Sequence, residues 1–119
     1  MKGLGQHLIL ELWGGDSDKL DSLELVEKAL VDAVEACGFH LKDLRIYPFS
    51  PQGITGVAVL SESHIAIHTW PEYRYAAIDV FTCGESAEPR RAIPILQSYF
   101  QAEHIQVMEV VRGIFPLYD

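Results

Sequence analysis

The sequence predicts an α+β fold, a two-layer sandwich in which an antiparallel sheet carries two helices on one face. Two observations lead to this prediction. Extended segments dominate the chain, and short connections containing Pro or Gly join several of them, as is typical of antiparallel neighbours. Only two segments repeat apolar residues at intervals of three and four, so helices are in the minority. The second face of such a sheet needs a cover, and a second copy of the chain is the natural candidate.

The strands are expected where apolar residues alternate or dominate a short run. Leu8, Leu10 and Leu12 share one face of the first strand, and the Gly14-Gly15 pair ends it. The six expected strands occupy residues 6–13, 44–49, 56–60, 63–70, 75–82 and 104–112.

The first helix is expected over residues 22–37. Asp21 and Glu24 form a D-x-x-E capping pattern at its start, and Gly38 supplies a C-terminal stop. Because Cys37 belongs to the apolar series of this helix, we interpret it as part of the core. The series consists of Val26, Ala29, Leu30, Ala33, Val34 and Cys37.

The second helix is expected over residues 89–102. Pro89 suits the first turn of a helix. Pro94 should kink the helix or delay its start, because proline lacks the N–H that an interior position needs. The apolar face is formed by Ala92, Ile93, Leu96, Tyr99 and Phe100.

Length and composition describe one globular domain spanning residues 1–119. Hydrophobic residues make up 49% of the chain and charged residues 22%, so a core can form. A net charge of −8 without a basic stripe argues against nucleic acid or anionic membrane surfaces as partners. No apolar run approaches the roughly 18–20 residues of a membrane span. Without a secretion signal or a disulfide framework, the predicted location is cytoplasmic.

Residues 60–73, which read LSESHIAIHTWPEY, crowd nucleophilic and titratable groups into a β-rich stretch. Together with Cys83 after the next strand they suggest catalysis, but spacing alone does not name the reaction. A zinc site of His64, His68 and Cys83 is disfavoured, because four residues along a strand span about 13 Å and zinc ligands lie within about 2.0–2.3 Å of the metal. The sequence also lacks a G-x-S-x-G nucleophile elbow and a well-placed pyridoxal-phosphate lysine.

Three runs of residues carry a family resemblance. They are Ser61-Glu62-Ser63-His64, the run IHTWPEY at 67–73 and the run AAIDVFTCG at 76–84. With them the sequence resembles the prokaryotic S-adenosylmethionine decarboxylase proenzymes, over essentially the whole chain. The resemblance implies a homodimer whose two sheets face each other in an α/β/β/α sandwich, with active sites at or near the interface.

The resemblance implies that the chain makes its own cofactor, a covalent pyruvoyl group. With the zinc site disfavoured, no residue is assigned to a metal. The Ser63 hydroxyl would attack the carbonyl of Glu62 and convert the peptide bond into an ester. β-Elimination would then release a β chain of residues 1–62 and leave Ser63 as the pyruvoyl group that begins an α chain of residues 63–119. Because an amide resists attack by a neutral hydroxyl, we expect a strained turn and a stabilised oxyanion at this bond.

Two more residues match family positions that serve the cleavage. His68 matches the residue that removes the α-proton for elimination. On a strand that begins at Ser63, His68 has the opposite parity, so a bend or bulge would be needed to bring the two together. Thr55 matches a serine that assists processing. It keeps the hydroxyl but has a stiffer rotamer, which leaves the speed of processing open.

For turnover, the resemblance implies that the pyruvoyl ketone forms a Schiff base with the substrate amine and accepts electrons as carbon dioxide leaves. Cys83 matches the donor that reprotonates the α-carbon. Phe49 and Trp70 match aromatic residues of the nucleoside and sulfonium pocket, and Glu72 matches an acid that takes the ribose hydroxyls. Arg74 replaces the family's usual glycine, so a positive φ there would strain Arg74 or reshape the turn.

The implied reaction is the decarboxylation of S-adenosyl-L-methionine to S-adenosyl 3-(methylthio)propylamine, the aminopropyl donor for spermidine synthesis in this family. Two alternatives stay open. Pyruvoyl-dependent arginine or ornithine decarboxylases use similar machinery, although the expected nucleoside pocket favours adenosylmethionine. A non-cleaving homologue could instead regulate an active partner, although intact Ser63, His68 and Cys83 argue against this.

Overall fold

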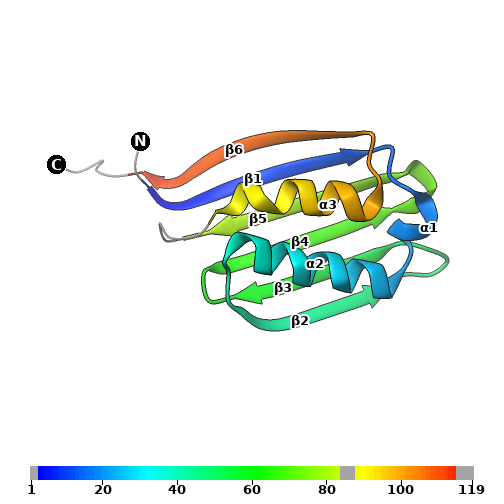
Figure 1. Ribbon diagram of the computed structural model, residues 1–119, viewed down its shortest axis with the longest axis horizontal. Coiled ribbons are helices and arrows are strands. Elements are labelled where there is room, and N and C mark those ends of the chain that lie inside the picture. Colours follow the sequence, from blue (N-terminus) through cyan, green and yellow to red (C-terminus); the bar gives the residue numbers. More distant parts are fainter. Residues whose placement is uncertain (1–2, 84–87, 115–119) are drawn as a thin grey trace.

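The structure, a computed structural model, describes residues 3–83 and 88–114 (Figure 1). These residues form one antiparallel sheet from the strands β1 (Gly3–Trp13), β2 (Leu41–Pro48), β3 (Ile54–Leu60), β4 (Ser63–Trp70), β5 (Tyr75–Thr82) and β6 (His104–Ile114). The helices are α1 (Ser17–Leu20), α2 (Leu23–Cys37) and α3 (Ala92–Phe100), and the 3-10 turns are η1 (Pro71–Tyr73) and η2 (Pro89–Arg91). Gly84, the last residue of the third family run, lies outside the described residues.

The strand order in the sheet is β2-β3-β4-β5-β1-β6. The amino-terminal strand β1 therefore lies between β5 and β6, two strands from the other half of the chain. The predicted bounds of β4 and β5 are confirmed, whereas β1, β2 and β3 begin earlier than predicted and β6 ends later. The residues missed at the start of β2 are all exposed, so they show no alternation that could have predicted a strand.

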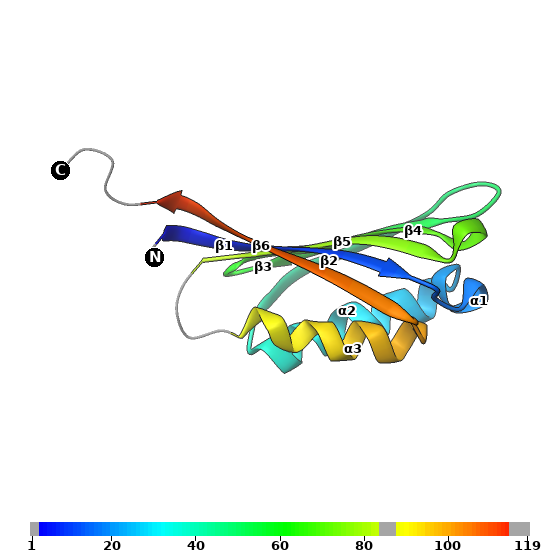
Figure 2. The ribbon, with the colours of Figure 1, turned by 90° about the horizontal axis from the view of Figure 1, so that it is seen from above.

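Both long helices pack on one face of the sheet, as predicted (Figure 2). Leu8, Leu10 and Leu12 on β1 are fully buried beneath them. Every residue of the predicted apolar series of α2 is buried, and Cys37 belongs to the core as predicted. Burying these side chains supplies the main favourable term in folding.

The start of α2 differs from the prediction in its cap. Ser22, not Asp21, is the N-cap residue, and its hydroxyl accepts a hydrogen bond from the Leu25 N–H at 3.2 Å. The Asp21 carboxylate instead accepts a bond from the Gly53 N–H at 2.9 Å and holds the β2–β3 loop. Gly38 adopts the left-handed conformation that ends the helix, as predicted.

The second helical segment begins later than residue 89, as the delay expected from Pro94 allowed. Residues of η2 form a 3-10 turn, and α3 starts at Ala92. Pro94 is therefore in the first turn of α3, where the missing N–H costs little, so the predicted delay is confirmed. The helix ends at Phe100, because Gln101 takes a left-handed conformation with φ 50°.

The sheet face away from α2 and α3, which we call the outer face, is not covered within the described part of one chain. It exposes large apolar side chains on several strands: Trp13, Tyr47, Val59, Trp70, Met108 and Val110. Among the described residues, no helix is both long and apolar enough to cross a membrane. The prediction that a second copy covers this face stays a prediction.

Candidate active site

The predicted site residues lie at the two ends of β4. Alternation along the strand buries Ile65, Ile67 and Thr69 under the helices and leaves His64 and His68 half-buried on the outer face. Because β4 pairs with β3 on one side and β5 on the other, loops and strand ends from both neighbours reach each end of it. We call these the processing end, where β4 begins, and the pocket end, where it finishes.

The processing end holds the peptide bond between Glu62 and Ser63. Ser63 has φ 147°, a conformation that L residues rarely adopt and that costs of the order of 1–3 kcal/mol. The Glu62 carbonyl oxygen accepts a hydrogen bond from the Cys83 N–H at 2.9 Å and from the Cys83 thiol at 3.2 Å. Attack on this carbonyl would place negative charge on that oxygen, where both donors already point. The strain and the donors expected for this bond are therefore both present.

The Glu62 side chain is fixed by His40. Its carboxylate accepts a hydrogen bond from the His40 N–H at 3.0 Å and lies 2.7 Å from the ring nitrogen Nδ1. These bonds, the backbone one first, lower the pKa of Glu62 below its usual value. The turn that carries the Glu62–Ser63 bond is also tied back by the Ser61 N–H, which donates to the His40 carbonyl at 2.9 Å.

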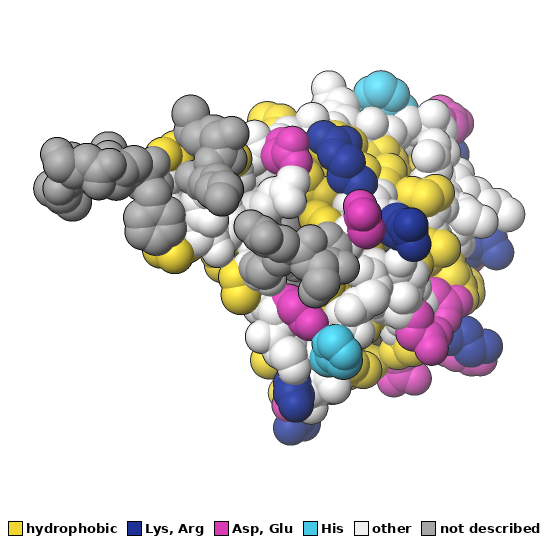
Figure 3. Space-filling model, turned by 60° about the vertical axis from the view of Figure 1, so that its left-hand side comes forward, with side chains coloured by type: hydrophobic (Ala, Val, Ile, Leu, Met, Phe, Trp, Pro, Cys, Tyr) yellow, Lys and Arg dark blue, Asp and Glu magenta, His cyan; other side chains and the backbone are white. Residues whose placement is uncertain are grey.

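Within the described part of the chain, His64 is the histidine whose ring contacts the Ser63 hydroxyl. Ser63 Oγ lies 3.4 Å from His64 Nδ1. The His64 ring lies beside the ring of Phe81 on β5, with 5.8 Å between centroids. From the sequence, His64 was considered as a ligand of the disfavoured zinc site and as part of the first family run, but it was given no role in cleavage. Its position directly after the nucleophile was the signal that could have suggested one. Figure 3 turns this end of the molecule toward the viewer and shows histidine, acidic and basic side chains beside apolar ones.

The pocket end gathers the other five predicted residues around a cavity of about 300 Å³. They come from the β2–β3 loop, β3, β4 and η1 and are Phe49, Thr55, His68, Trp70 and Glu72. The Phe49 and Trp70 side chains remain 57% and 40% exposed, so their rings are available to a ligand. Thr55 Oγ1 lies 3.0 Å from His68 Nδ1 across the β3–β4 pair, so the threonine hydroxyl reaches the histidine.

The structure does not bring His68 to Ser63 within one chain. The two residues are five positions apart on β4, about 16 Å along the strand. The pairing of β4 with β5 runs from Ser63 to Trp70 without a register shift, so the bend or bulge that the prediction required is not there. Its absence has a physical reason, because β4 is hydrogen-bonded on both sides and an extra residue would disrupt both ladders.

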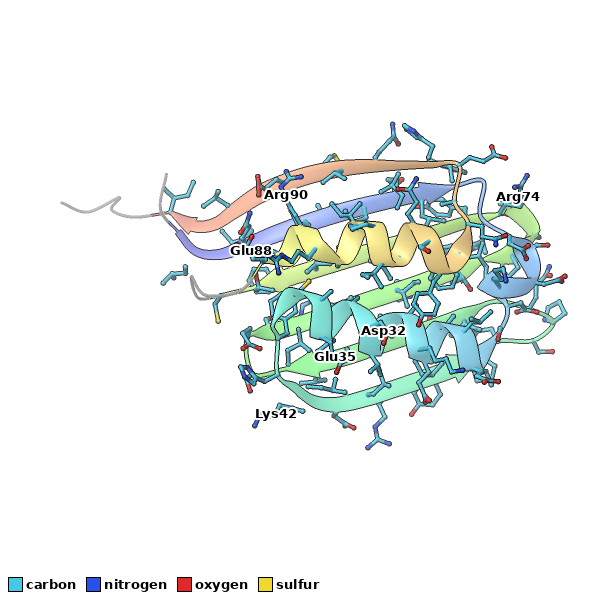
Figure 4. All side chains as sticks on the ribbon, in the orientation of Figure 1. Asp32, Glu35, Lys42, Arg74, Glu88 and Arg90 are labelled. Carbon is cyan, nitrogen blue, oxygen red and sulfur yellow. The ribbon has the colours of Figure 1, made fainter. Side chains whose placement is uncertain are left out.

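Arg74 follows η1 in a left-handed conformation, with φ 53°. Of the two outcomes considered from the sequence, the structure shows the strained arginine. Its side chain spans to the β1–α1 loop, where Nε donates to the Gly15 carbonyl at 2.9 Å and a terminal nitrogen donates to the Gly14 carbonyl at 3.0 Å. A weaker contact of 3.4 Å reaches Glu103. Arg74 therefore clamps the turn that carries Glu72, at the end of the sheet far from the processing end (Figure 4).

The two cysteines have different surroundings. Cys83 is exposed beside the Glu62 carbonyl, whereas Cys37 is buried and its thiol donates to the Pro89 carbonyl at 3.6 Å. Burial raises the pKa of Cys37 to about 11, so its thiol stays protonated and unreactive at neutral pH. Within the described residues, no three His, Cys, Asp or Glu side chains come together as metal ligands.

Comparisons with known proteins decide the family. The family model described as S-adenosylmethionine decarboxylase matches residues 6–113. The chain belongs to the S-adenosylmethionine decarboxylase family. It is 60% identical to the S-adenosylmethionine decarboxylase proenzyme of Methanococcus maripaludis strain C5, over 96% of this chain and 93% of that protein. It is 52% identical to the proenzyme of the same name from Thermomicrobium roseum, over 96% of this chain and 97% of that protein.

The fold of this family member agrees with a solved structure. The crystal structure of the adenosylmethionine decarboxylase from Aquifex aeolicus superposes with a TM-score of 0.89 at 36% identity, covering 100% of this chain and 98% of that chain. The family resemblance seen in the sequence is thus confirmed. The names of these relatives favour adenosylmethionine over arginine or ornithine as the substrate of the family.

Proposed function

We propose that this chain is a proenzyme that cleaves itself between Glu62 and Ser63 and then decarboxylates S-adenosyl-L-methionine. One observation carries the proposal: a strained serine follows a carbonyl whose oxygen already accepts two hydrogen bonds from Cys83. Amide carbonyls are poor electrophiles, and strain together with a preformed oxyanion site supplies what an attacking hydroxyl needs.

The cleavage proceeds in two stages. Ser63 Oγ forms a bond to the Glu62 carbonyl carbon, the C–N bond breaks, and the serine proton ends on the freed amine. Removal of the Ser63 α-proton then expels the Glu62 carboxylate and leaves a dehydroalanine, which water converts to a pyruvoyl group with loss of ammonia. The products are a β chain of residues 1–62 and an α chain of residues 63–119.

The residues around Ser63 are suited to a pyruvoyl group at this position. When formed, the pyruvoyl carbonyl supplies the electron sink that makes loss of carbon dioxide possible. The exposed Cys83 thiol lies beside the reacting bond, and cleavage frees it from its contact with the Glu62 carbonyl. We assign this thiol the delivery of a proton to the substrate α-carbon.

A complete site needs two copies of the chain. Ser63 and Cys83 lie at the processing end, whereas His68 and the aromatic pocket lie at the other end of the same sheet. If two outer faces pack together about a two-fold axis that crosses the strands, the pocket end of each copy covers the processing end of the other. The partner's His68 then reaches Ser63, which explains how it can take the α-proton without a bulge in β4. The apolar side chains of the outer face support this α/β/β/α homodimer.

The pocket end has the chemistry to hold the substrate. The rings of Phe49 and Trp70 can contact the adenine and the sulfonium, and a desolvated cation on a ring face gains up to about 2 kcal/mol. The Glu72 carboxylate can accept hydrogen bonds from the ribose hydroxyls. The product would serve as the aminopropyl donor for spermidine synthesis. The cytoplasmic location stays a prediction from the sequence.

Intact mass spectrometry tests the proposal, with Ser63→Ala as the matched control. We expect the wild type to give residues 1–62 and a pyruvoyl-blocked chain of residues 63–119, while the variant stays whole. The cleaved protein should release carbon dioxide from S-adenosyl-L-methionine and not from arginine or ornithine. A wild type that stays whole after long incubation contradicts the proposal and favours a non-cleaving regulatory homologue.

A further inference from the structure

We propose that His64 is the catalytic base of the first stage of self-cleavage, the transfer of the Glu62 acyl group from nitrogen to the Ser63 oxygen. This inference rests on the proposed self-cleavage and adds a residue to it. The proposed mechanism gives the partner's His68 the second stage, removal of the α-proton, and leaves the first stage without a base. The Ser63 hydroxyl must lose its proton to become a competent nucleophile.

The contact between the two side chains depends on the strained backbone. In a regular strand, neighbouring residues point to opposite faces. Ser63 pairs with the buried Thr82, so a regular conformation would direct its side chain toward the helices. With φ 147°, its Oγ instead lies 3.4 Å from Nδ1 of His64, a residue of the outer face. Catalytic hydrogen bonds are often this long at rest and shorten as reaction begins.

The surroundings of His64 hold its ring in place. Its cross-strand neighbours are Phe81 on β5 and Val59 on β3, and the Phe81 ring lies 5.8 Å away. Phe81 in turn is contacted by His7 at 5.4 Å and by the Arg112 guanidinium at 5.7 Å. The titratable groups nearest the reacting bond are thus His64 itself, Cys83 and the Glu62–His40 pair, with His7, Asp79 and Arg112 beyond Phe81.

The other four histidines of the chain are engaged or remote. His7 binds the Asp79 carboxylate at 3.0 Å on the far side of Phe81. His40 binds the Glu62 carboxylate through its own Nδ1. His68 and His104 lie at the opposite end of the sheet, where β4 finishes and β6 begins. Among the described residues of one chain, His64 therefore is the histidine placed to reach the hydroxyl, while the partner's His68 keeps the second stage.

The proton returns within the same stage. His64 Nδ1, with its ring proton on Nε2, takes the proton from Ser63 Oγ as the oxygen bonds to the Glu62 carbonyl carbon. The Cys83 N–H and thiol stabilise the oxyanion. When the C–N bond breaks, the imidazolium gives the proton to the leaving Ser63 nitrogen. The result is an ester and a free amine, with no net proton gained or lost.

The test separates the two stages with hydroxylamine, which cleaves an ester at Glu62 and leaves an amide intact. We expect His64→Ala and His64→Asn to cleave themselves at least about 100-fold more slowly than the wild type and to resist hydroxylamine. Added imidazole should partly restore cleavage of His64→Ala. The matched controls are His104→Ala, which should cleave normally, and His68→Ala, which should stall as an ester that hydroxylamine cuts.

His64→Phe is a control for packing, because it keeps a ring beside Phe81 but has no nitrogen that could act as a base. A folded His64→Phe that stays whole and resists hydroxylamine supports the base. The inference is overturned if any folded His64 variant cleaves at the wild-type rate, or if it stalls as a hydroxylamine-sensitive ester. It is also overturned if imidazole fails to rescue His64→Ala and the pH profile of the residual cleavage matches that of the wild type. Failure of the wild type itself to cleave would count against the proposed function instead.

Discussion

At the processing end of β4 the proposed reacting group is the backbone itself, whereas at the pocket end regular strands present side chains to a cavity. The Glu62–Ser63 bond combines a positive φ with a carbonyl that has two donors from Cys83. At the other end, Thr55 and His68 share a hydrogen bond across an undistorted pair of strands. Under the proposed function, the comparison teaches that one chain holds two incomplete halves of a site, one for making the cofactor and one for recognising the substrate.

The first prediction, with the largest expected effect, tests whether the two half-sites act across a dimer. One chain has its pocket end inactivated, and a second chain has its processing end inactivated. We expect His68→Ala chains to stay whole alone and to be cleaved when they are co-expressed with Ser63→Ala chains. In the mixed dimer, the intact Ser63 of one chain meets the intact His68 of its partner. Intact mass spectrometry of the mixture should show the change from undetectable to extensive cleavage.

The control for this experiment is a partner that carries both substitutions, Ser63→Ala and His68→Ala, which should rescue nothing. Efficient cleavage of His68→Ala by itself would contradict the role of His68. Lack of rescue by Ser63→Ala, with mixed dimers shown to be present, would contradict a site shared between two chains.

The second prediction concerns the hydroxyl of Thr55. Thr55→Val keeps the shape of the side chain but removes the hydrogen bond to His68, so the histidine loses its orientation. A hydrogen bond of about 1–1.5 kcal/mol corresponds to cleavage about tenfold slower. Thr55→Ser should cleave at least as fast as the wild type, because it keeps the hydroxyl. Time courses of chain cleavage measure both, and equal rates for all three proteins would show that the hydroxyl has no part in processing.

The third prediction uses Arg74 to test whether the pocket end affects substrate binding without affecting self-cleavage. Arg74→Ala removes the bonds to the Gly14 and Gly15 carbonyls and loosens the turn that carries Glu72. We expect KM for S-adenosyl-L-methionine to rise about three- to tenfold, while kcat and the rate of self-cleavage change less than twofold. Arg74→Gly should retain more affinity than Arg74→Ala, since glycine accepts the left-handed conformation without strain. A change confined to kcat or to self-cleavage would contradict a role at the pocket end.

The smallest expected effect is the acid sensitivity of the processing end. Because the pKa of Glu62 is lowered in the folded chain, its contribution to stability is present above its ordinary pKa of 4.5 and is lost as the pH falls through the folded value. Urea unfolding of Ser63→Ala, which keeps the chain whole, should show a free-energy advantage over Ser63→Ala/Glu62→Gln at pH 7 that shrinks below pH 4.5. An advantage that is constant down to pH 3 would assign the effect to something other than the Glu62 charge.

Most of the fold could be predicted from the sequence, because the residues that start, continue and end each strand or helix are close together in the chain. The bounds of β4 and β5 follow from alternation and from the Pro71 turn, and the stop at Gly38 follows from the conformational freedom of glycine. The true cap of α2 was missed because Asp21 is engaged by Gly53, which lies 32 residues further along the chain. A pattern of residues close together in the sequence cannot show that a distant backbone N–H takes the Asp21 carboxylate away from the helix.

The residues of the candidate site could be singled out from the sequence by type, but their arrangement could not, and their roles stay predictions. The opposite parity of Ser63 and His68 was visible in the sequence, and the bulge that would have brought them together within one chain does not occur. The sign of φ at Ser63 and the contact with His64 depend on how the β3–β4 turn is held by His40 and Cys83. His40 and Cys83 are distant from Ser63 along the chain, so only the folded structure brings them to the Glu62–Ser63 bond.

The position of β1 between β5 and β6 has a consequence for the cleaved protein. A cut before Ser63 would assign β1, β2 and β3 to one polypeptide and β4, β5 and β6 to the other. The two would then be interleaved, since β3 pairs with β4 and β1 pairs with both β5 and β6. They could separate only by dismantling three ladders of backbone hydrogen bonds. Once unfolded, they would have to find each other again in a concentration-dependent encounter, whereas the uncut chain refolds alone.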